Sequence, residues 1–334
     1  MIADDRLEDE QQVRAIKHST VQLALQLPLW FKTVTEEHSV SANVQGVQFR
    51  LLVTLVFLLL AMPYCVLSIE VFSFSEPHKV GKPIVPMSFV IPTVFSEVRC
   101  LNIMLRSLLN STAFPGETIV VASGNNELHT KEIELLKASL KTVSQILPGV
   151  KLIILSGLHQ QAHSRNTGGN MSAYKIVSFF DGDDYVHPQR FDILNRTMAE
   201  YPEVDLLLHN FEKFTYEETI ICQMKTNITI LLRPDQIQRR YESRGWHVGE
   251  LVTDWKKHWR RMYMIWVFPE YPSIANGWST MNKRSVLDSI PYIPLNGAED
   301  SFHNAQVIIR GMKVMVINAD LGFYRQRVNR RKTC

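Results

Sequence analysis

The chain alternates between short apolar runs and longer amphipathic stretches from Ile84 onward, and this alternation restricts the fold more than any other feature. Apolar runs bounded by Gly, Pro, Ser or Asn predict strands, and apolar residues three and four positions apart predict helices. Strands are predicted at 87–91, 118–122, 150–155 and 174–180, helices at 97–110 and 132–147, and a glycine-marked helix start at 164–173. Strands connected through helices pair in parallel, so we expect an α/β domain with a mostly parallel central sheet flanked by helices.

Three carboxylates follow the last of these strands, at Asp181, Asp183 and Asp184. Open α/β sheets bind ligands at the carboxyl ends of their strands, which is where this acidic corner lies. Crowded carboxylates resist joint ionisation unless a cation relieves them, and oxygen-only ligands suit Mg²⁺ or Mn²⁺. One alternative is an acidic loop that caps a helix over 189–201. Another is an aspartyl phosphohydrolase, which Tyr185 disfavours because Thr or Val is expected there.

A second acidic pair, Glu299 and Asp300, precedes a predicted amphipathic helix over 301–310. A positioned carboxylate can take the proton of an alcohol, which is otherwise a poor nucleophile at neutral pH. The structural alternative is a pair of first-turn acids that the helix dipole favours. On the same helix, His303 is a candidate for approaching a metal or diphosphate, although a lone helical histidine is more often structural.

An uncharged apolar run covers residues 51–69 and is long enough to cross a bilayer. We predict a flexible cytosolic tail over 1–48, a single transmembrane helix over 49–72, a linker over 73–84 and a catalytic domain over 85–330. The run lacks the period of an amphipathic core helix, and a long polar stretch precedes it, which disfavours a cleaved signal peptide.

Charges around the apolar run favour a cytosolic N-terminus, because Arg50 precedes the run and Glu70 and Glu76 follow it. Four Asn-x-Ser/Thr triplets, which agree with a lumenal domain in the Golgi or endoplasmic reticulum, come after the run, at Asn110, Asn170, Asn195 and Asn227. The alternative is a cytosol-facing enzyme that acts on lipid at a membrane.

Overall charge and cysteine spacing narrow the function classes. Lys plus Arg outnumber Asp plus Glu by only 36 to 33, which gives no argument for nucleic acid as a partner. The four cysteines form no C-x-x-C pair, so neither a zinc site nor a redox motif is indicated. The sequence permits one disulfide, between Cys100 and Cys222.

Several short motifs, in their order and spacing, resemble the inverting family 2 glycosyltransferases, which have the nucleotide-sugar-binding GT-A fold. The resemblance covers roughly residues 86–327, and its motifs are Val90-Ile-Pro-Thr93, Glu97, Leu105-Arg-Ser-Leu108, Glu117-Thr-Ile-Val-Val121, Arg165-Asn166, Asp181-Gly-Asp-Asp184, Gly297-Ala-Glu-Asp300 and Tyr324-Arg325. It implies a metal-dependent, inverting transfer of a hexose or N-acetylhexosamine from a nucleotide-sugar donor to a hydroxyl on a glycan, glycoprotein or lipid.

The resemblance also implies roles for single residues. Asp183 and Asp184 would contact the metal or diphosphate, with Asp181 nearer the ribose. Asp300 would deprotonate the acceptor hydroxyl, and Glu299 would orient acceptor or base. The remaining donor-binding residues would be Pro92, Thr93, Glu97, Ser123, Asn125, Arg165, Asn166 and Trp278.

The chain departs from the family pattern at one position, and it also lacks a motif of processive synthases. Many members have Asp at the second strand end, where this chain has Ser123-Gly-Asn-Asn126, so the base contact differs. A catalytically silent, membrane-tethered binding or scaffolding protein is therefore the alternative function. The Gln-x-x-Arg-Trp motif of processive synthases is missing, because the run Gln236-Ile-Gln-Arg-Arg240 ends without Trp. Together with a single span, this predicts non-processive transfer.

Overall fold

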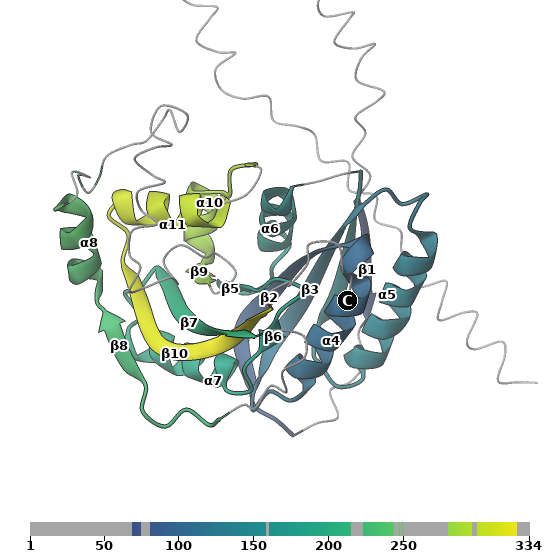
Figure 1. Cartoon of the computed structure of the whole chain (residues 1–334), viewed down its shortest axis with the longest axis horizontal. Coiled ribbons are helices and arrows are strands. Elements are labelled where there is room, and N and C mark those ends of the chain that lie inside the picture. Colours follow the sequence, from purple (N-terminus) through teal and green to yellow (C-terminus); the bar gives the residue numbers. More distant parts are fainter. Residues whose placement is uncertain are drawn as a thin grey trace, which may run out of the picture. The chain divides into compact units, whose positions relative to one another are not determined.

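A ten-stranded mixed sheet with helices on both faces organises the part of the chain that the computed structural model describes (Figure 1). The described residues are 69–74, 81–157, 160–214, 223–243, 247, 249, 280–295 and 299–325. The strand order is β1-β4-β3-β2-β5-β9-β7-β10-β6, with β8 beside β10. The strands are β1 (Ile69–Phe74), β2 (Ile84–Val94), β3 (Phe114–Gly124), β4 (Val150–Ser156), β5 (Ile176–Phe179), β6 (Tyr185–Val186), β7 (Leu206–Phe214), β8 (Thr229–Leu232), β9 (Thr280–Lys283) and β10 (Val314–Arg325). The helices are η2 (Phe95–Glu97), α4 (Val98–Leu109), α5 (Thr130–Ser144), α6 (Gln161–Asn170), α7 (Arg190–Glu200), α8 (Pro234–Glu242), α10 (Arg284–Ser289) and α11 (Glu299–Ile309).

The first half of the sheet is parallel, as the sequence predicts. β2 pairs in parallel with β3 and β5, and β3 pairs in parallel with β4. Side chains of β2 alternate between two buried faces: Phe89 and Ile91 pack with α4, α5 and α7, whereas Val90 packs with α6 and α10. Figure 1 shows α6, α10 and α11 above the sheet and α7 below it. Burial on both faces explains why these strands are continuous apolar runs.

The second half of the sheet is mixed, which corrects the prediction of a mostly parallel sheet. β9 pairs antiparallel with both β5 and β7, and β10 is parallel to β7 but antiparallel to β6 and β8. A separate core of α8, α10 and α11 side chains covers β7 and β10. The four-residue β9 and two-residue β6 are too short to leave a periodic signal in the sequence.

Helix α6 lies three residues earlier than the sequence predicted. Residues 164–173, expected to start a helix, instead form the second part of α6 and the turn after it. Gly168 and Gly169 therefore lie inside the helix, where they let it approach the sheet. A Cβ atom at Gly168 would collide with Val90 and Val121.

Substituting Gly168 with Ala is expected to lower the free energy of unfolding by about 1–3 kcal/mol, because the stiff Val90 side chain cannot yield. The gain in helix propensity, about 1 kcal/mol, offsets only part of this strain. Gly169→Ala is the matched control, since its Cβ would lie 3.2 Å from the mobile end of Leu287. Urea unfolding of the two variants checks the prediction, and equal stability of both would contradict it.

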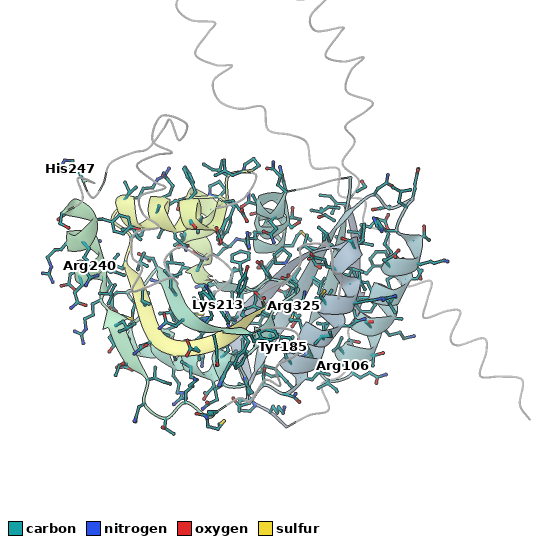
Figure 2. The ribbon with its side chains drawn as sticks, in the orientation of Figure 1. Arg106, Tyr185, Lys213, Arg240, His247 and Arg325 are labelled. Atoms are coloured by element: carbon teal, nitrogen blue, oxygen red, sulfur yellow. The ribbon has the colours of Figure 1, made fainter. Side chains whose placement is uncertain are left out.

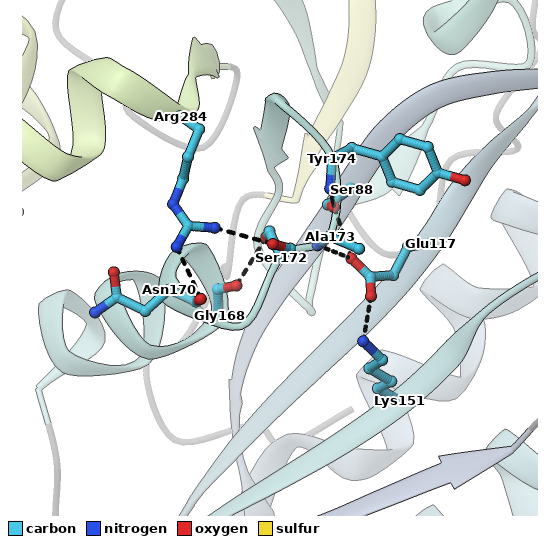
Figure 3. A network of polar contacts seen from close by, with 9 residues as sticks. All are labelled: Ser88, Glu117, Lys151, Gly168, Asn170, Ser172, Ala173, Tyr174 and Arg284. Carbon is cyan, nitrogen blue, oxygen red and sulfur yellow. Dashed lines mark hydrogen bonds and ion pairs between the residues drawn. The ribbon is translucent and has the colours of Figure 1, made fainter. Parts of the chain in front are cut away.

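A polar network fixes the C-terminal end of α6 at the amino edge of the sheet (Figure 3). Arg284 donates to the carbonyls of Asn170 and Ser172, at 2.8 and 3.0 Å, and so satisfies carbonyl groups that the end of the helix leaves open. Buried Glu117 accepts hydrogen bonds from Ser88 and from the Ala173 N–H, and it pairs with Lys151. This network anchors the helix that carries Arg165.

The predicted membrane helix lies mostly outside the described residues. Its last four residues, together with the first two of the predicted linker, form strand β1, which corrects that boundary. Phe72 and Phe74 alternate along β1 and pack against the main core, a period-two pattern that suits a strand. Within the ranges that the structure describes, no helix combines the length and apolar character needed to cross a membrane.

Candidate functional site

The acidic corner continues from β5 alongside the end of β2. The Phe180 N–H donates to the Val90 carbonyl at 3.1 Å, and the Gly182 N–H donates to the Pro92 carbonyl at 3.3 Å. A Cβ at position 182 would lie 3.1 Å from the Thr93 hydroxyl oxygen, so glycine allows this close approach without a shift of Thr93. The strands β2 and β5 are parallel, so their carboxyl ends lie at the same edge of the sheet. The predicted residues Pro92 and Thr93 therefore lie beside the carboxylates.

The three carboxylates of the corner are close enough to share a cation. One oxygen each from Asp181, Asp183 and Asp184 lies within 4.8 Å of the others. Asp184 is buried; its Oδ1 accepts the Arg325 N–H at 3.0 Å, and its Oδ2 has no hydrogen-bond partner among the described residues. These oxygen donors fit a hard divalent ion.

The electrostatics of the corner favour an added positive charge. Burial raises the pKa of Asp181 to about 7, Arg165 opposes this, and Asp183 adds to it. Burial, and then the charges of Asp183 and Asp181, also raise the pKa of Asp184 well above its usual range. The corner therefore resists full ionisation by itself, and a bound cation would remove that resistance.

Arg165 connects the acidic corner to the second acidic pair. Its guanidinium, fully buried on α6, donates to Asp181 at 2.8 Å and to Glu299 at the start of α11. It also lies 5.5 Å from the ring centroid of Tyr292. Burial lowers the pKa of Arg165, but the carboxylates of Asp181, Glu299 and Asp300 outweigh it and raise that pKa above its usual value. The side chain is thus a permanent cation shared between two carboxylates.

Glu299 and Asp300 lie on the same side of the molecule as the corner, but they differ in environment. Glu299 is buried against Arg165. Asp300 is half-buried; its Oδ1 accepts the Ser301 N–H at 2.6 Å, and its charge raises the pKa of Asp181. Glu299 therefore holds Arg165, and Asp300 is the member of the pair that retains solvent exposure.

Arg325 is a further residue of the corner, and the sequence pointed to it only as part of the Tyr324-Arg325 motif. It is the last residue of β10 (Figure 2), and its buried guanidinium lies 3.6 Å from Asp183 Oδ2. With its backbone N–H bonded to Asp184, it contacts two of the three carboxylates. Only the long-range pairing of β10 brings it there, so no local pattern could have revealed this contact.

A cavity of about 390 Å³ adjoins the ends of β2, β3 and β4. The predicted residues Ser123 and Asn125 line it, whereas Glu97, at the end of η2, does not. Asn125 Oδ1 accepts the N–H groups of Glu127 and Leu128 and shapes the turn. Phe95 and His129 also line the cavity, with their ring centroids 5.7 Å apart, and no sequence pattern pointed to them.

The remaining predicted site residues lie elsewhere. Asn166 forms two hydrogen bonds with the backbone of Tyr292, at 2.7 and 2.8 Å, so its amide tethers that segment, and its role toward a nucleotide stays a prediction. Trp278 lies outside the described residues. His303 stacks on Tyr292 at 4.1 Å and contacts Asn282 at 3.2 Å, which agrees with the structural alternative.

His303 gives a testable pH dependence. Burial, followed by the charge of Arg165, lowers its pKa from 6.5 to about 3. The unfolded chain then binds the proton more readily than the folded chain does. The contribution of neutral His303 to the free energy of unfolding is therefore fully present above pH 6.5 and is lost as the pH falls toward 3. At pH 5 the loss is on the order of 2 kcal/mol. His303→Gln keeps an N–H donor and should show a smaller drop in unfolding free energy between pH 7 and pH 5 than the wild type. An identical drop would contradict a buried neutral His303.

Comparison with known proteins gives distant likeness only. No protein-family model and no curated protein matches the sequence. The solved structures that are similar to this chain include fragment 1–349 of S. aureus TarS in complex with UDP-GlcNAc. It has 17% sequence identity and a TM-score of 0.46, and the match covers 73% of this chain and 59% of that one. They also include the mannosyltransferase PcManGT from Pyrobaculum calidifontis in complex with GDP-Man and Mn²⁺, at 16% identity and a TM-score of 0.43, covering 77% and 62%. The match thus spans less than two thirds of either structure, and similarity this distant does not assign a function.

Proposed function

We propose that this protein is a metal-dependent, inverting, non-processive glycosyltransferase that moves one sugar from a nucleotide-sugar donor to a hydroxyl acceptor. One observation carries the proposal: Arg165 bridges Asp181 and Glu299, so the acidic corner and the candidate base beside Glu299 converge at the carboxyl ends of the parallel strands. The neighbouring cavity has room for a nucleoside. The motif resemblance to family 2 glycosyltransferases supports the same function.

Each part of the site has a role in this proposal. Asp181, Asp183 and Asp184 would hold Mg²⁺ or Mn²⁺, which supplies positive charge to the diphosphate of the donor. Asp300 takes the proton of the acceptor hydroxyl, and Arg165 keeps Asp181 and Glu299 in place. Attack on the anomeric carbon from the side opposite the departing diphosphate inverts its configuration.

We also propose that the domain is lumenal and is anchored by the single apolar run before β1. Cys100 is disulfide-bonded. Disulfides persist in oxidising compartments and are rare in the cytosol. This favours the Golgi or endoplasmic reticulum over a cytosol-facing enzyme.

Nucleotide release from a panel of nucleotide sugars, with Mn²⁺, Mg²⁺ or a chelator, tests the transferase. Release should require the metal and should fall at least about tenfold in Asp183→Asn, because a metal ligand is lost. Asp192→Asn is the control, since Asp192 pairs only with exposed Arg196 on α7. Metal-dependent nucleotide binding without any release would instead favour the catalytically silent alternative. Equal release by Asp183→Asn and the control would refute the metal site.

A further inference from the structure

The four Asn-x-Ser/Thr triplets differ in their structural surroundings. Asn227 is exposed in the segment 223–228, which is neither helix nor strand, and its triplet ends at exposed Thr229. Asn195 is half-buried within α7, and the Thr197 hydroxyl of the same triplet is buried and donates to the Ile193 carbonyl at 2.9 Å. A bulky modification is therefore compatible with folding at Asn227 and unfavourable at Asn195.

The triplets at Asn110 and Asn170 lie between these two in how well their surroundings would accommodate a bulky modification. Both asparagines are exposed at the C-terminal ends of helices, α4 and α6. The hydroxyl of Ser172, in the triplet of Asn170, donates to the Gly168 carbonyl at 2.8 Å. The middle residue of the Asn110 triplet, Ser111, is fully buried. Asn110 and Thr112 are both exposed, but Asn110 is the C-cap of α4. Asn227 is thus the triplet whose exposed asparagine lies away from helix ends and whose exposed Thr229 hydroxyl accepts a hydrogen bond, from Asn318 at 3.5 Å, rather than donating to its own backbone.

Strand β8 begins two residues after Asn227 and forms an edge of the sheet. It pairs antiparallel with β10, and among the described strands β10 is its only partner. Figure 1 shows β8 at the left margin of the sheet. Its sequence, Thr-Ile-Leu-Leu, carries no charge. An uncharged edge strand presents unpaired backbone groups that another chain can extend, so proteins cover or interrupt such edges.

We propose that Asn227 carries an N-linked oligosaccharide that covers the edge of β8 opposite β10, which no described strand pairs with. The inference rests on the lumenal placement proposed above. In the step, a C–N bond forms between Asn227 Nδ2 and the anomeric carbon of a lipid-diphosphate-linked oligosaccharide. The anomeric C–O bond to the diphosphate breaks, the lipid diphosphate leaves, and the amide loses one proton. The hydrated sugar then separates the apolar edge from other chains.

The test uses the full chain expressed in cells that perform N-glycosylation. Amidase release in ¹⁸O-water converts each glycosylated Asn to labelled Asp, which peptide mass spectrometry then locates. We expect label at Asn227 in the wild type and in Thr229→Ser, which keeps the hydroxyl. We expect no label at Asn227 in Thr229→Ala, which removes the hydroxyl. Asn195→Gln should change the mass of the intact chain only by the one methylene group that the substitution adds. Asn227→Gln should lower that mass by one oligosaccharide and should increase self-association in light scattering.

Each other outcome has a defined meaning. Label at another triplet with none at Asn227 overturns the inference and leaves the lumenal placement standing. Absence of label at all four triplets overturns both. Label at Asn227 without increased self-association of Asn227→Gln overturns the role at the edge of β8. Nucleotide release, measured on the same preparation, reports on the transferase independently of these results.

Discussion

Replacing Asp300 with Asn is expected to lower the transfer rate about 10²–10⁴-fold, the usual contribution of a positioned general base. Asn keeps the size of the side chain and its acceptor oxygen for the Ser301 N–H, but it cannot take a proton. Because the loss concerns the chemical step, kcat should fall while the KM for the donor stays near the wild-type value, and the affinity for Mn²⁺ should fall far less than kcat. Nucleotide release from the donor that the panel identifies measures all three.

The control for Asp300→Asn is Asp235→Asn, which removes an exposed carboxylate paired with Arg239 on α8. Its rate should equal that of the wild type. Wild-type turnover by Asp300→Asn, under conditions where Asp183→Asn is impaired, would remove Asp300 from the mechanism and leave the metal site in place. A rise in donor KM with unchanged kcat would instead make Asp300 a binding residue.

The second large effect is expected at Arg165. Arg165→Met should lower the free energy of unfolding by about 3–5 kcal/mol, because it leaves two carboxylates, Asp181 and Glu299, without their shared cation. This is a large part of the stability of an ordinary domain, which is about 5–15 kcal/mol. Methionine keeps much of the aliphatic volume, so cavity formation contributes little. Urea unfolding at neutral pH without divalent ions measures the change.

The matched control is Arg196→Met on α7. Arg196 also pairs with a carboxylate, Asp192, at 2.8 Å, but both side chains are largely exposed, at 62% and 41%. Exposed pairs four residues apart on a helix contribute only about 0.3–0.5 kcal/mol. Equal destabilisation by the two substitutions would show that Arg165 does not bridge the two acidic sites.

Local patterns predicted the first half of the fold well. The apolar runs of β2, β3 and β4 are buried on both faces, so their hydrophobicity is continuous and easy to detect. The amphipathic spacing of α4 and α5 gave their positions within a few residues. The sequence also located the acidic corner, because its three Asp residues directly follow an apolar run that predicts a strand.

Long-range contacts were not accessible from the sequence. Arg165 and Glu299 are 134 positions apart, and an arginine is rarely expected to be fully buried. The family resemblance implied that Arg165 and Asn166 face the nucleotide, and that role stays a prediction. It could not show that Asn166 also tethers Tyr292 or that Arg165 pairs with carboxylates. The pairing of β10, which delivers Arg325, likewise depends on tertiary packing rather than on periodicity.

The bridge formed by Arg165 makes the two acidic sites thermodynamically dependent on each other. A cation loaded beside Asp181 competes with the guanidinium for that carboxylate and so changes the field felt by Glu299 and Asp300. By reciprocity, the factor by which a bound cation changes the protonation equilibrium of Asp300 is also the factor by which a change of charge at Asp300 alters the affinity for the cation. In the proposed reaction, a cation at the acidic corner and an acceptor beside Asp300 would therefore influence each other's binding through one buried arginine.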